Sequence, residues 1–347
     1  MLIKNLSEKQ IIEKKETNSK FFSITNKKFN QHCKILKDDF FIDSFNYFPI
    51  TLGGHTFKNV FKWGDISKYE IFYTKKFLEN FENNKDKFKH YSDAIIIGSS
   101  ANDNYFTNMV TFLPRIFFLK QKEVTIVINR NSSNKFRNFI GHILKKLNIK
   151  LKKFIYLDDN FYKFTNSEIP QFLNKKASFE ILNKRFCNLK KGTKKIKIFL
   201  SRQNSNYRNL INEDDIVKTL KLNGFKIIDT NNMSIFEQIQ YFKRAEVVIG
   251  PTGSALTNII FCQKGTKVLE ITPKYKYNYE KNFKIRYSNI CNILNLKYSS
   301  ISADSVDINK IDNKVKKYIN KNVLNNSNYY KDLLIEKNKI ESKINKY

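Results

Sequence analysis

The stretch that decides the fold is Glu246-Val-Val-Ile-Gly250-Pro-Thr-Gly253-Ser-Ala-Leu-Thr-Asn258-Ile-Ile-Phe261. A short β-branched apolar run leads into a Gly/Pro turn, and the turn leads into residues with helical apolar spacing. The pattern predicts a buried strand, a tight turn and the start of a helix. At the carboxyl end of a parallel strand, the free N–H groups of such a helix can hold a phosphate. The spacing alone fits ordinary tight packing equally well.

Strand and helix patterns alternate around this turn. Lys195–Leu200, Phe225–Asp229 and Lys267–Ile271 have the composition of buried strands, whereas Asn212–Leu222 and Ser234–Lys243 have polar caps and helical spacing. The alternation predicts a parallel sheet with helices on both faces, which is a Rossmann-like α/β domain.

A second, less regular block precedes it. Strand patterns cover Asp93–Gly98, Glu123–Asn129 and Phe154–Leu157, and helical patterns cover Asn104–Lys120 and Lys135–Leu147. The block predicts another α/β domain.

The chain is strongly basic. Its 347 residues contain 63 Lys and Arg against 32 Asp and Glu, a net charge of +31, and only eight of the basic residues are Arg. Nucleic acid, an anionic membrane surface and a polyanionic or nucleotide-linked substrate all suit such a charge. A codon bias toward Lys and Asn explains it equally simply. Because the lysines are spread out and no nucleic-acid-binding motif occurs, specific nucleic-acid binding is disfavoured.

The cysteines and the N-terminal sequence bear on location. Cys33, Cys187, Cys262 and Cys291 form no C-x-x-C pair and have no histidine at metal-ligand spacing, so reduced thiols and no metal site are expected. No signal-like apolar segment is apparent at the start. We expect a cytoplasmic protein, with peripheral contact to the anionic inner face of a membrane left open.

A second polar turn, Ser201–Arg208, follows the first strand of the C-terminal block. In a chain that uses Lys almost everywhere, Arg202 and Arg208 indicate a need for the planar, multi-donor guanidinium, as in phosphate recognition. The alternative is an ordinary ion pair with Glu213 or Asp214.

An ordered set of motifs runs through Ser201-Arg202, Arg208, Asn212-Glu213, Gly224-Phe225, Glu237-Gln238-Ile239, Ala245–Phe261 and Val268-Leu-Glu270, with a weaker match at Asn104-Tyr105-Phe106 and Leu113-Pro114-Arg115. This set resembles glycosyltransferase family 61. The resemblance implies a GT-B-like α/β architecture, with two Rossmann-like domains facing across a cleft. It implies an inverting, metal-independent transfer of a hexosyl or pentosyl group from a nucleotide sugar to a glycan or lipid-linked glycan acceptor, in cell-surface polysaccharide or lipopolysaccharide biosynthesis.

Several residues are expected to form the site. No cofactor is expected besides the nucleotide-sugar co-substrate. The acceptor hydroxyl needs a general base, for which Asp103 is the candidate, with a helix N-cap role as the alternative. Glu270 is expected to bind ribose hydroxyls or to pair with Lys267. The donor-binding candidates are Arg202, Arg208, Glu213, Thr252, Gly253, Ser254, Asn258 and Glu270.

Two positions depart from the family pattern. Thr107 and Thr252 stand where the family usually has His. Thr can donate a hydrogen bond but cannot act as a base near neutral pH. A catalytically silent nucleotide- or glycan-binding protein of the same fold is therefore the alternative function, and a basic nucleic-acid-binding protein is a weaker one.

Together, pattern and resemblance divide the chain into five parts. The expected parts are a weakly patterned segment 1–30, an N-terminal Rossmann-like acceptor domain 31–168, a linker helix 169–191, a C-terminal Rossmann-like donor-binding domain 192–325 and a Lys-rich helix 326–347.

Overall fold

The computed structural model divides into two compact units, Met1–Ser178 and Phe179–Tyr347, which we describe separately. Their boundary falls inside the segment 169–191, which was expected to be a linker helix. The residues that the structure describes are 4–6, 20–43, 49–51, 55–57, 79, 83, 87–98, 104–129, 132–157, 161–205, 208–275, 281–306 and 330–344.

The C-terminal unit is built on a six-stranded sheet. Its first five strands are parallel, which confirms the predicted parallel sheet, and the last is antiparallel to its neighbour. In chain order the parallel strands are arranged 2-1-3-4-5, the order of a doubly wound sheet. In spatial order the strands are β12 (Phe225–Ile228), β11 (Ile196–Leu200), β13 (Ala245–Pro251), β14 (Lys267–Pro273), β15 (Lys297–Val306) and β16 (Asp332–Leu334).

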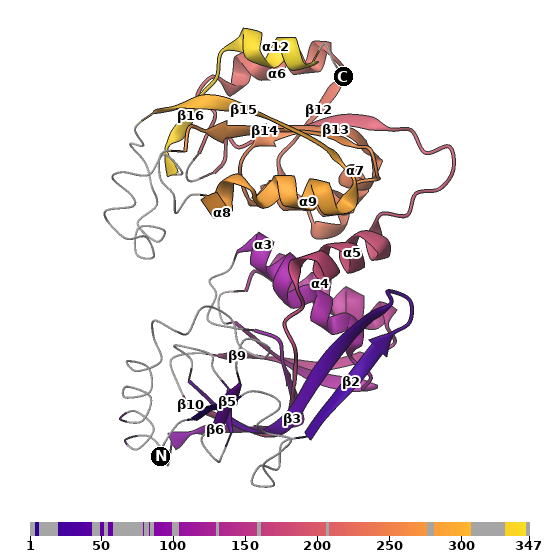
Figure 1. The fold of residues 1–347 in the computed structure, drawn as a ribbon, viewed down its shortest axis with the longest axis vertical. Coiled ribbons are helices and arrows are strands. Elements are labelled where there is room, and N and C mark those ends of the chain that lie inside the picture. Colours follow the sequence, from indigo (N-terminus) through magenta and orange to yellow (C-terminus); the bar gives the residue numbers. More distant parts are fainter. Residues whose placement is uncertain are drawn as a thin grey trace. The chain divides into compact units, whose positions relative to one another are not determined.

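Helices cover both faces of this sheet (Figure 1). On one face lie α6 (Glu213–Leu222) and α12 (Lys337–Ile344), and on the other lie α7 (Ile235–Arg244), α8 (Lys281–Lys284) and α9 (Arg286–Leu294). α6, α7, α9 and α12 each bury apolar side chains, and those of α6 and α12 pack in one core cluster with the sheet.

The helix ends explain two sequence signals. Ser234 caps α7 in a capping box: its hydroxyl accepts from the Glu237 N–H at 3.2 Å, and the Glu237 carboxylate accepts from the Ser234 N–H at 2.7 Å. Gly224, just beyond α6, has a φ of 79°, the left-handed conformation that favours glycine after a helix. Asn212 precedes α6 as predicted, but its side-chain amide donates to the Ile335 carbonyl at 2.7 Å instead of capping the helix.

The C-terminal segment differs from the single helix expected over 326–347. Residues Asp332–Leu334 form β16, and only Lys337–Ile344 are helical. The cause is the alternate burial of Leu333 and Ile335, which enter the sheet's core, as a strand period of two requires.

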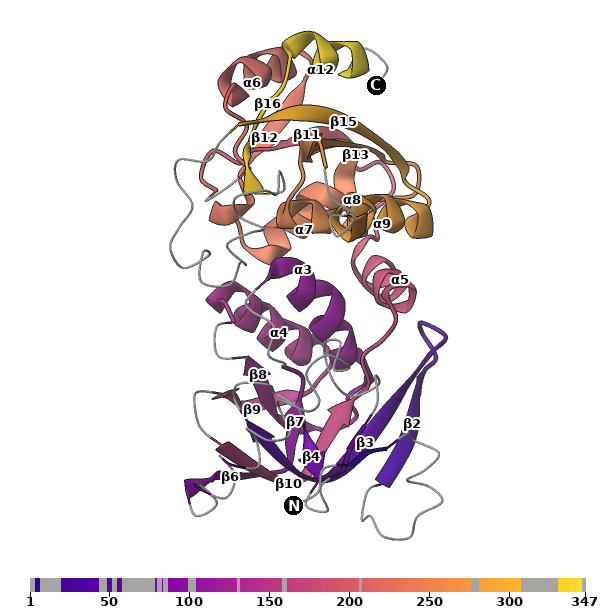
Figure 2. The ribbon, with the colours of Figure 1, turned by 60° about the vertical axis from the view of Figure 1, so that its left-hand side comes forward.

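The N-terminal unit has a mixed sheet. β7, β8 and β9 are mutually parallel, as a Rossmann-like domain requires, but β3 is antiparallel to both β2 and β10. Figure 2 shows the long β2–β3 hairpin. In spatial order its strands are β2 (Lys20–Asn26), β3 (Gln31–Asp43), β10 (Phe161–Pro170), β7 (Ala94–Ile96), β8 (Glu123–Asn129) and β9 (Lys150–Leu157). Two short strands extend it: β4 (Ile50–Thr51) pairs with β3, and β6 (Lys89–Ser92) pairs with β10. A separate two-stranded sheet pairs β1 (Lys4–Leu6) with β5 (His55–Phe57).

The helices of this unit follow the predicted ranges. The helical segment expected over Asn104–Lys120 has three parts, α3 (Tyr105–Thr107), a π-helix η2 (Asn108–Phe112) and a 3₁₀ helix η3 (Leu113–Phe118) that begins next to Pro114. α4 (Asn134–Lys146) buries the predicted apolar face. α5 (Lys175–Phe186) contains the boundary between the two units.

Candidate functional site

The candidate site lies where the strand order of the C-terminal sheet reverses. From β11 the chain moves outward to β12, and from β13 it moves the opposite way to β14. Open α/β sheets bind ligands at the carboxyl ends of the two strands that flank such a switch point. Arg202 follows β11 and Thr252-Gly253 follow β13, so the topology brings the two predicted turns together.

Arg202 connects these two turns. Its side chain is buried, and its Nε donates to the Arg208 carbonyl at 3.1 Å. Its guanidinium lies against Gly253, where an added Cβ would be 2.1 Å from Nη1. Gly253 is therefore explained by the close approach of the arginine, since its φ of 170° is open to any residue. The structure thus joins Arg202, Arg208 and Gly253, three predicted donor-binding residues.

Glu213 holds the first turn in place. It is buried at the start of α6, accepts a hydrogen bond from the Ser201 hydroxyl and accepts another from the Arg202 main-chain N–H at 3.1 Å. Burial raises the pKa of Glu213, and the bonds from Ser201 and Arg202 oppose the rise. Asp214, the other expected ion-pair partner, accepts instead from the Gln203 amide at 2.6 Å.

Glu270 is fully buried in β14. The Tyr298 hydroxyl donates to its Oε2 at 2.7 Å. Burial raises the pKa of Glu270 to about 7, while bonds from Thr252 and Tyr298 and the charges of Arg208 and Arg286 oppose the rise. The carboxyl group is thus enclosed by the protein's own polar groups, below the surface at which a ribose hydroxyl was expected to meet it.

The remaining predicted residues divide by exposure. The Ser254 side chain faces solvent at the start of the 3₁₀ helix η5 (Ser254–Phe261). Thr252 is buried, and its N–H donates to the Ile271 carbonyl at 2.8 Å. The buried Asn258 amide donates to Gln238 Oε1 at 2.8 Å and to the Ala255 carbonyl at 3.1 Å, which joins η5 to α7.

Three residues of the cluster were missed in the sequence. Tyr287 on α9 donates from its buried hydroxyl to the Gly253 carbonyl at 2.6 Å, and Tyr298 and Arg286 surround Glu270. All three follow the last recognisable motif. The helical spacing of Tyr287 to the buried Ile290 and Cys291 is the one signal that could have marked it as core-facing.

Asp103, the candidate base, lies outside the described residues. The N-cap of the helix after it is Asn104, whose side chain accepts from the Thr107 N–H at 3.3 Å, so the alternative N-cap role for Asp103 is wrong. Thr107 is half-buried in α3.

Arg115, from the weaker N-terminal motif, is buried in the other unit. Its Nη1 donates to the Ile97 carbonyl at 2.6 Å, its Nη2 to the Ile96 carbonyl at 3.1 Å and its Nε to the Pro170 carbonyl at 2.9 Å. The guanidinium also lies 4.0 Å from the centre of the Phe172 ring. Burial lowers the pKa of Arg115 to about 9, which leaves it charged at neutral pH.

The switch-point cluster has an excess of positive charge. Three guanidinium groups, those of Arg202, Arg208 and Arg286, face two carboxyl groups, Glu213 and Glu270, whose pKa values burial raises. Within the described ranges no three His, Cys, Asp or Glu side chains gather as metal ligands, and the four cysteines are free thiols. Such a cluster, beside a helix start, suits a diphosphate.

Comparison with known proteins adds one finding. The protein-family model described as Glycosyltransferase 61 matches residues 95–269, which is half of the chain. The match begins in β7 and ends in β14, one residue before Glu270, so it includes the turns after β11 and β13. No curated protein matches the chain.

Proposed function

Because the chain belongs to the glycosyltransferase 61 family, we propose that it transfers a sugar from a nucleotide sugar to a glycan or lipid-linked glycan acceptor. The observation that carries the proposal is the Arg202–Arg208 cluster at the switch point of the C-terminal sheet. Nucleotide ligands favour this position in a doubly wound sheet, and their diphosphates favour arginine.

In the proposed donor complex, the diphosphate binds next to Arg202 and Ser254. Arg202 is held by the Arg208 carbonyl and by Glu213, so little conformational entropy is lost when it binds an anion. The Ser254 hydroxyl and the N–H groups in the first turn of η5 supply uncharged donors. Glu213, Glu270 and Asn258 act in this proposal by holding the arginines and η5 rather than by touching the sugar.

The proposed reaction is a single displacement with inversion. The acceptor hydroxyl oxygen forms a bond to the anomeric carbon while the bond from that carbon to the diphosphate oxygen breaks. The hydroxyl proton passes to the Asp103 carboxylate, and the leaving diphosphate's added negative charge is stabilised by the arginines. The proposed reaction needs no metal ion to stabilise the leaving diphosphate, so turnover in excess EDTA should equal turnover without EDTA. A loss of activity that Mg²⁺ restores would contradict metal independence.

The finer features of the proposal come from the family resemblance. They are a GT-B arrangement of the two units, a hexosyl or pentosyl donor, a role in surface polysaccharide or lipopolysaccharide biosynthesis, and a cytoplasmic location.

One observation favours a second candidate, a catalytically silent nucleotide- or glycan-binding protein. Thr252 is buried at a position where the family usually has His, and it cannot act as a base. Release of labelled sugar or nucleotide from any donor by the purified protein would exclude this candidate.

The experiment that tests the proposal is a thermal-shift screen against nucleoside diphosphates and nucleotide sugars. A ligand that binds only the native state at a hundredfold excess over its Kd adds about 2.7 kcal/mol to the free energy of unfolding. The melting temperature rises as a result. We expect one base to give the largest shift and Arg202→Lys to lose it. The absence of a shift with every nucleotide would contradict the proposal.

A further inference from the structure

The opposite edge of the same sheet, at the amino ends of its parallel strands, is almost entirely basic. We define the basic edge as residues 187–197, 221–226, 243–246, 262–268 and 295–298, all of which the structure describes. Glu246 is the one acidic residue in these ranges. The basic residues are Lys190, Lys191, Lys194, Lys195, Lys197, Lys221, Lys226, Lys243, Arg244, Lys264, Lys267 and Lys297.

Backbone contacts make this edge one continuous surface. Arg244 Nε donates to the Lys194 carbonyl at 3.2 Å, the Thr266 hydroxyl donates to the Ala245 carbonyl at 2.9 Å, and the Lys297 N–H donates to the Thr266 carbonyl at 2.9 Å. These bonds join the starts of β11, β13, β14 and β15. With strands about 4.8 Å apart, five strands give an edge roughly 20 Å wide.

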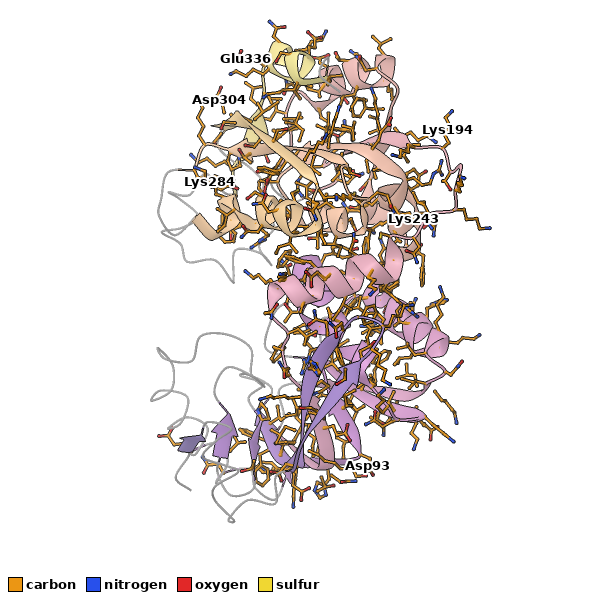
Figure 3. The ribbon with its side chains drawn as sticks, turned by 45° about the vertical axis from the view of Figure 1, so that its right-hand side comes forward. Asp93, Lys194, Lys243, Lys284, Asp304 and Glu336 are labelled. Carbon is orange, nitrogen blue, oxygen red and sulfur yellow. The ribbon has the colours of Figure 1, made fainter. Side chains whose placement is uncertain are left out.

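Most of the acidic residues that the structure describes in this unit lie at the other edge. Figure 3 shows Lys194 and Lys243 on one side of the unit, and Asp304 and Glu336 on the opposite side. Acidic residues at the carboxyl edge or in the first turns of helices are Glu213, Asp214, Asp215, Asp229, Glu237, Asp304 and Asp332.

Helix dipoles explain only part of this separation. Cations are favoured in the last turn of a helix, which accounts for Lys221, Lys243 and Arg244. Lys190 and Lys194 lie in the loop before β11, and Lys264 lies in the loop before β14. These exposed lysines gain nothing from a dipole, so the charge of the basic edge exceeds what the fold itself requires.

We propose that the basic edge binds an anionic membrane surface through lipid phosphate headgroups. Each Lys or Arg near such a surface adds to the electrostatic attraction, and lysines suit headgroups that need no fixed geometry. Leu222, which is 89% exposed at the same edge, supplies an apolar residue that can enter the interface. No large aromatic side chain among the described residues is exposed at this edge to stack on nucleic-acid bases.

The inference is independent of the proposed transferase activity. Binding through the amino edge leaves the carboxyl edge of the sheet, with Arg202 and Ser254, facing away from the lipid. Within the part of the chain that the structure describes, no helix is long and apolar enough to cross a membrane. Attachment through the basic edge would be electrostatic and reversible.

The test is flotation of the full chain with phosphatidylcholine vesicles, with and without phosphatidylglycerol, at low and physiological salt. The edge variant replaces Lys194, Lys195, Lys264 and Lys297 with Gln, and the control variant replaces the exposed Lys27, Lys28, Lys120 and Lys145 with Gln. Both lose the same charge. We expect salt-sensitive binding only to anionic vesicles, weakened at least about tenfold in the edge variant and less than about twofold in the control.

Three results would overturn the inference: no binding of the unaltered chain to anionic vesicles, equal losses in the two variants, or tighter binding to duplex DNA than to vesicles at equal phosphate. Melting temperatures show whether each variant is folded. Nucleotide-sugar binding, measured without vesicles, reports separately on the proposed function and is expected to be unchanged in both variants.

Discussion

Each unit of the molecule buries arginine at the carboxyl ends of parallel strands, but the two environments differ. Arg115 in the N-terminal unit donates to three main-chain carbonyls and lies on Phe172. Arg202 and Arg208 in the C-terminal unit lie with Glu213 and Glu270, beside the exposed Ser254. The hydrogen-bond donors of Arg115 are occupied by backbone carbonyls. Arg202 and Arg208, in contrast, lie beside a helix start that faces solvent.

The difference shows that a buried arginine is not in itself a binding residue. Arg115 replaces missing backbone partners at the end of β7 and near the end of β10, so we expect its loss to reduce stability. Arg202 and Arg208, together with Arg286, form a group of three guanidiniums near only two carboxyl groups, those of Glu213 and Glu270. Its charge is therefore only partly neutralised, and we expect its loss to reduce anion binding.

The largest predicted effect is that of Arg115→Ala. It leaves the carbonyls of Ile96, Ile97 and Pro170 without their donors in a buried site. We expect the free energy of unfolding to fall by about 3 kcal/mol or more, measured by urea denaturation. Arg244→Ala, at a half-buried arginine with one carbonyl contact, should cost less than about 1 kcal/mol. Equal losses would contradict the distinct role of Arg115.

The next effect is the pH dependence contributed by Glu270. Its pKa is raised from 4.5 to about 7, so the folded protein binds more protons than the unfolded chain between these values. Its contribution to stability is full below pH 4.5 and is lost as the pH rises through 7, by about 3 kcal/mol in total. The free energy of unfolding of Glu270→Gln, relative to that of the unaltered protein, should therefore rise from pH 5 to pH 8. Glu246→Gln, at an exposed site, serves as the matched control. A difference between Glu270→Gln and the unaltered protein that does not change with pH would refute the assignment.

A smaller effect is predicted for Gly253→Ala. The new Cβ would meet Arg202 Nη1 and displace the guanidinium. We expect a loss of roughly 1–2 kcal/mol of stability and at least about tenfold of nucleoside-diphosphate affinity by calorimetry. Gly141→Ala on α4, where a Cβ meets nothing within 4 Å, should be neutral or slightly stabilising. If Gly253→Ala binds nucleoside diphosphates with unchanged affinity, Gly253 is not part of the nucleotide site.

The smallest predicted effect is that of Tyr287→Phe. It removes the hydroxyl that donates to the Gly253 carbonyl at 2.6 Å and leaves the ring in place. We expect about 1 kcal/mol of lost stability and a several-fold weaker nucleotide affinity. Tyr241→Phe, at a half-buried tyrosine on α7, serves as the control. If both variants behave alike, Tyr287 does not hold the turn after β13.

Sequence reasoning predicted β11, β12, β13 and β14 of the C-terminal sheet because each is a short apolar run separated from the next by a helical pattern, whereas β15 was not predicted. The cap of α7 and the buried stripe of α4 are local signals of this kind. β10 was missed because its main partner, β3, lies far away in the sequence. The β2–β3 hairpin was missed although its strands are sequence neighbours, because the apolar pattern of this segment is weak. The helix expected over 326–347 was wrong at Leu333, whose place in the core depends on β15.

The site was predicted in part for the same reason. Arg202, Arg208 and Gly253 belong to local turns, and only the strand order of the sheet brings those turns together. Tyr287 and Tyr298 reach the site from α9 and β15 through tertiary contacts that no local pattern marks. Glu213 and Asn258 were expected to contact the donor directly, and their burial instead supports a role in holding the arginines and η5 in place.

The measurement that tests the central claim most directly is calorimetric titration of nucleoside diphosphates into the unaltered chain, Arg202→Lys and Arg115→Lys. Lysine keeps the charge but cannot reproduce the multi-donor guanidinium. We predict that Arg202→Lys weakens binding at least about tenfold with a nearly unchanged melting temperature. Arg115→Lys should lower the melting temperature while its folded fraction binds normally. Equal affinity in the unaltered chain and Arg202→Lys would contradict the claim that the C-terminal arginine cluster binds the donor.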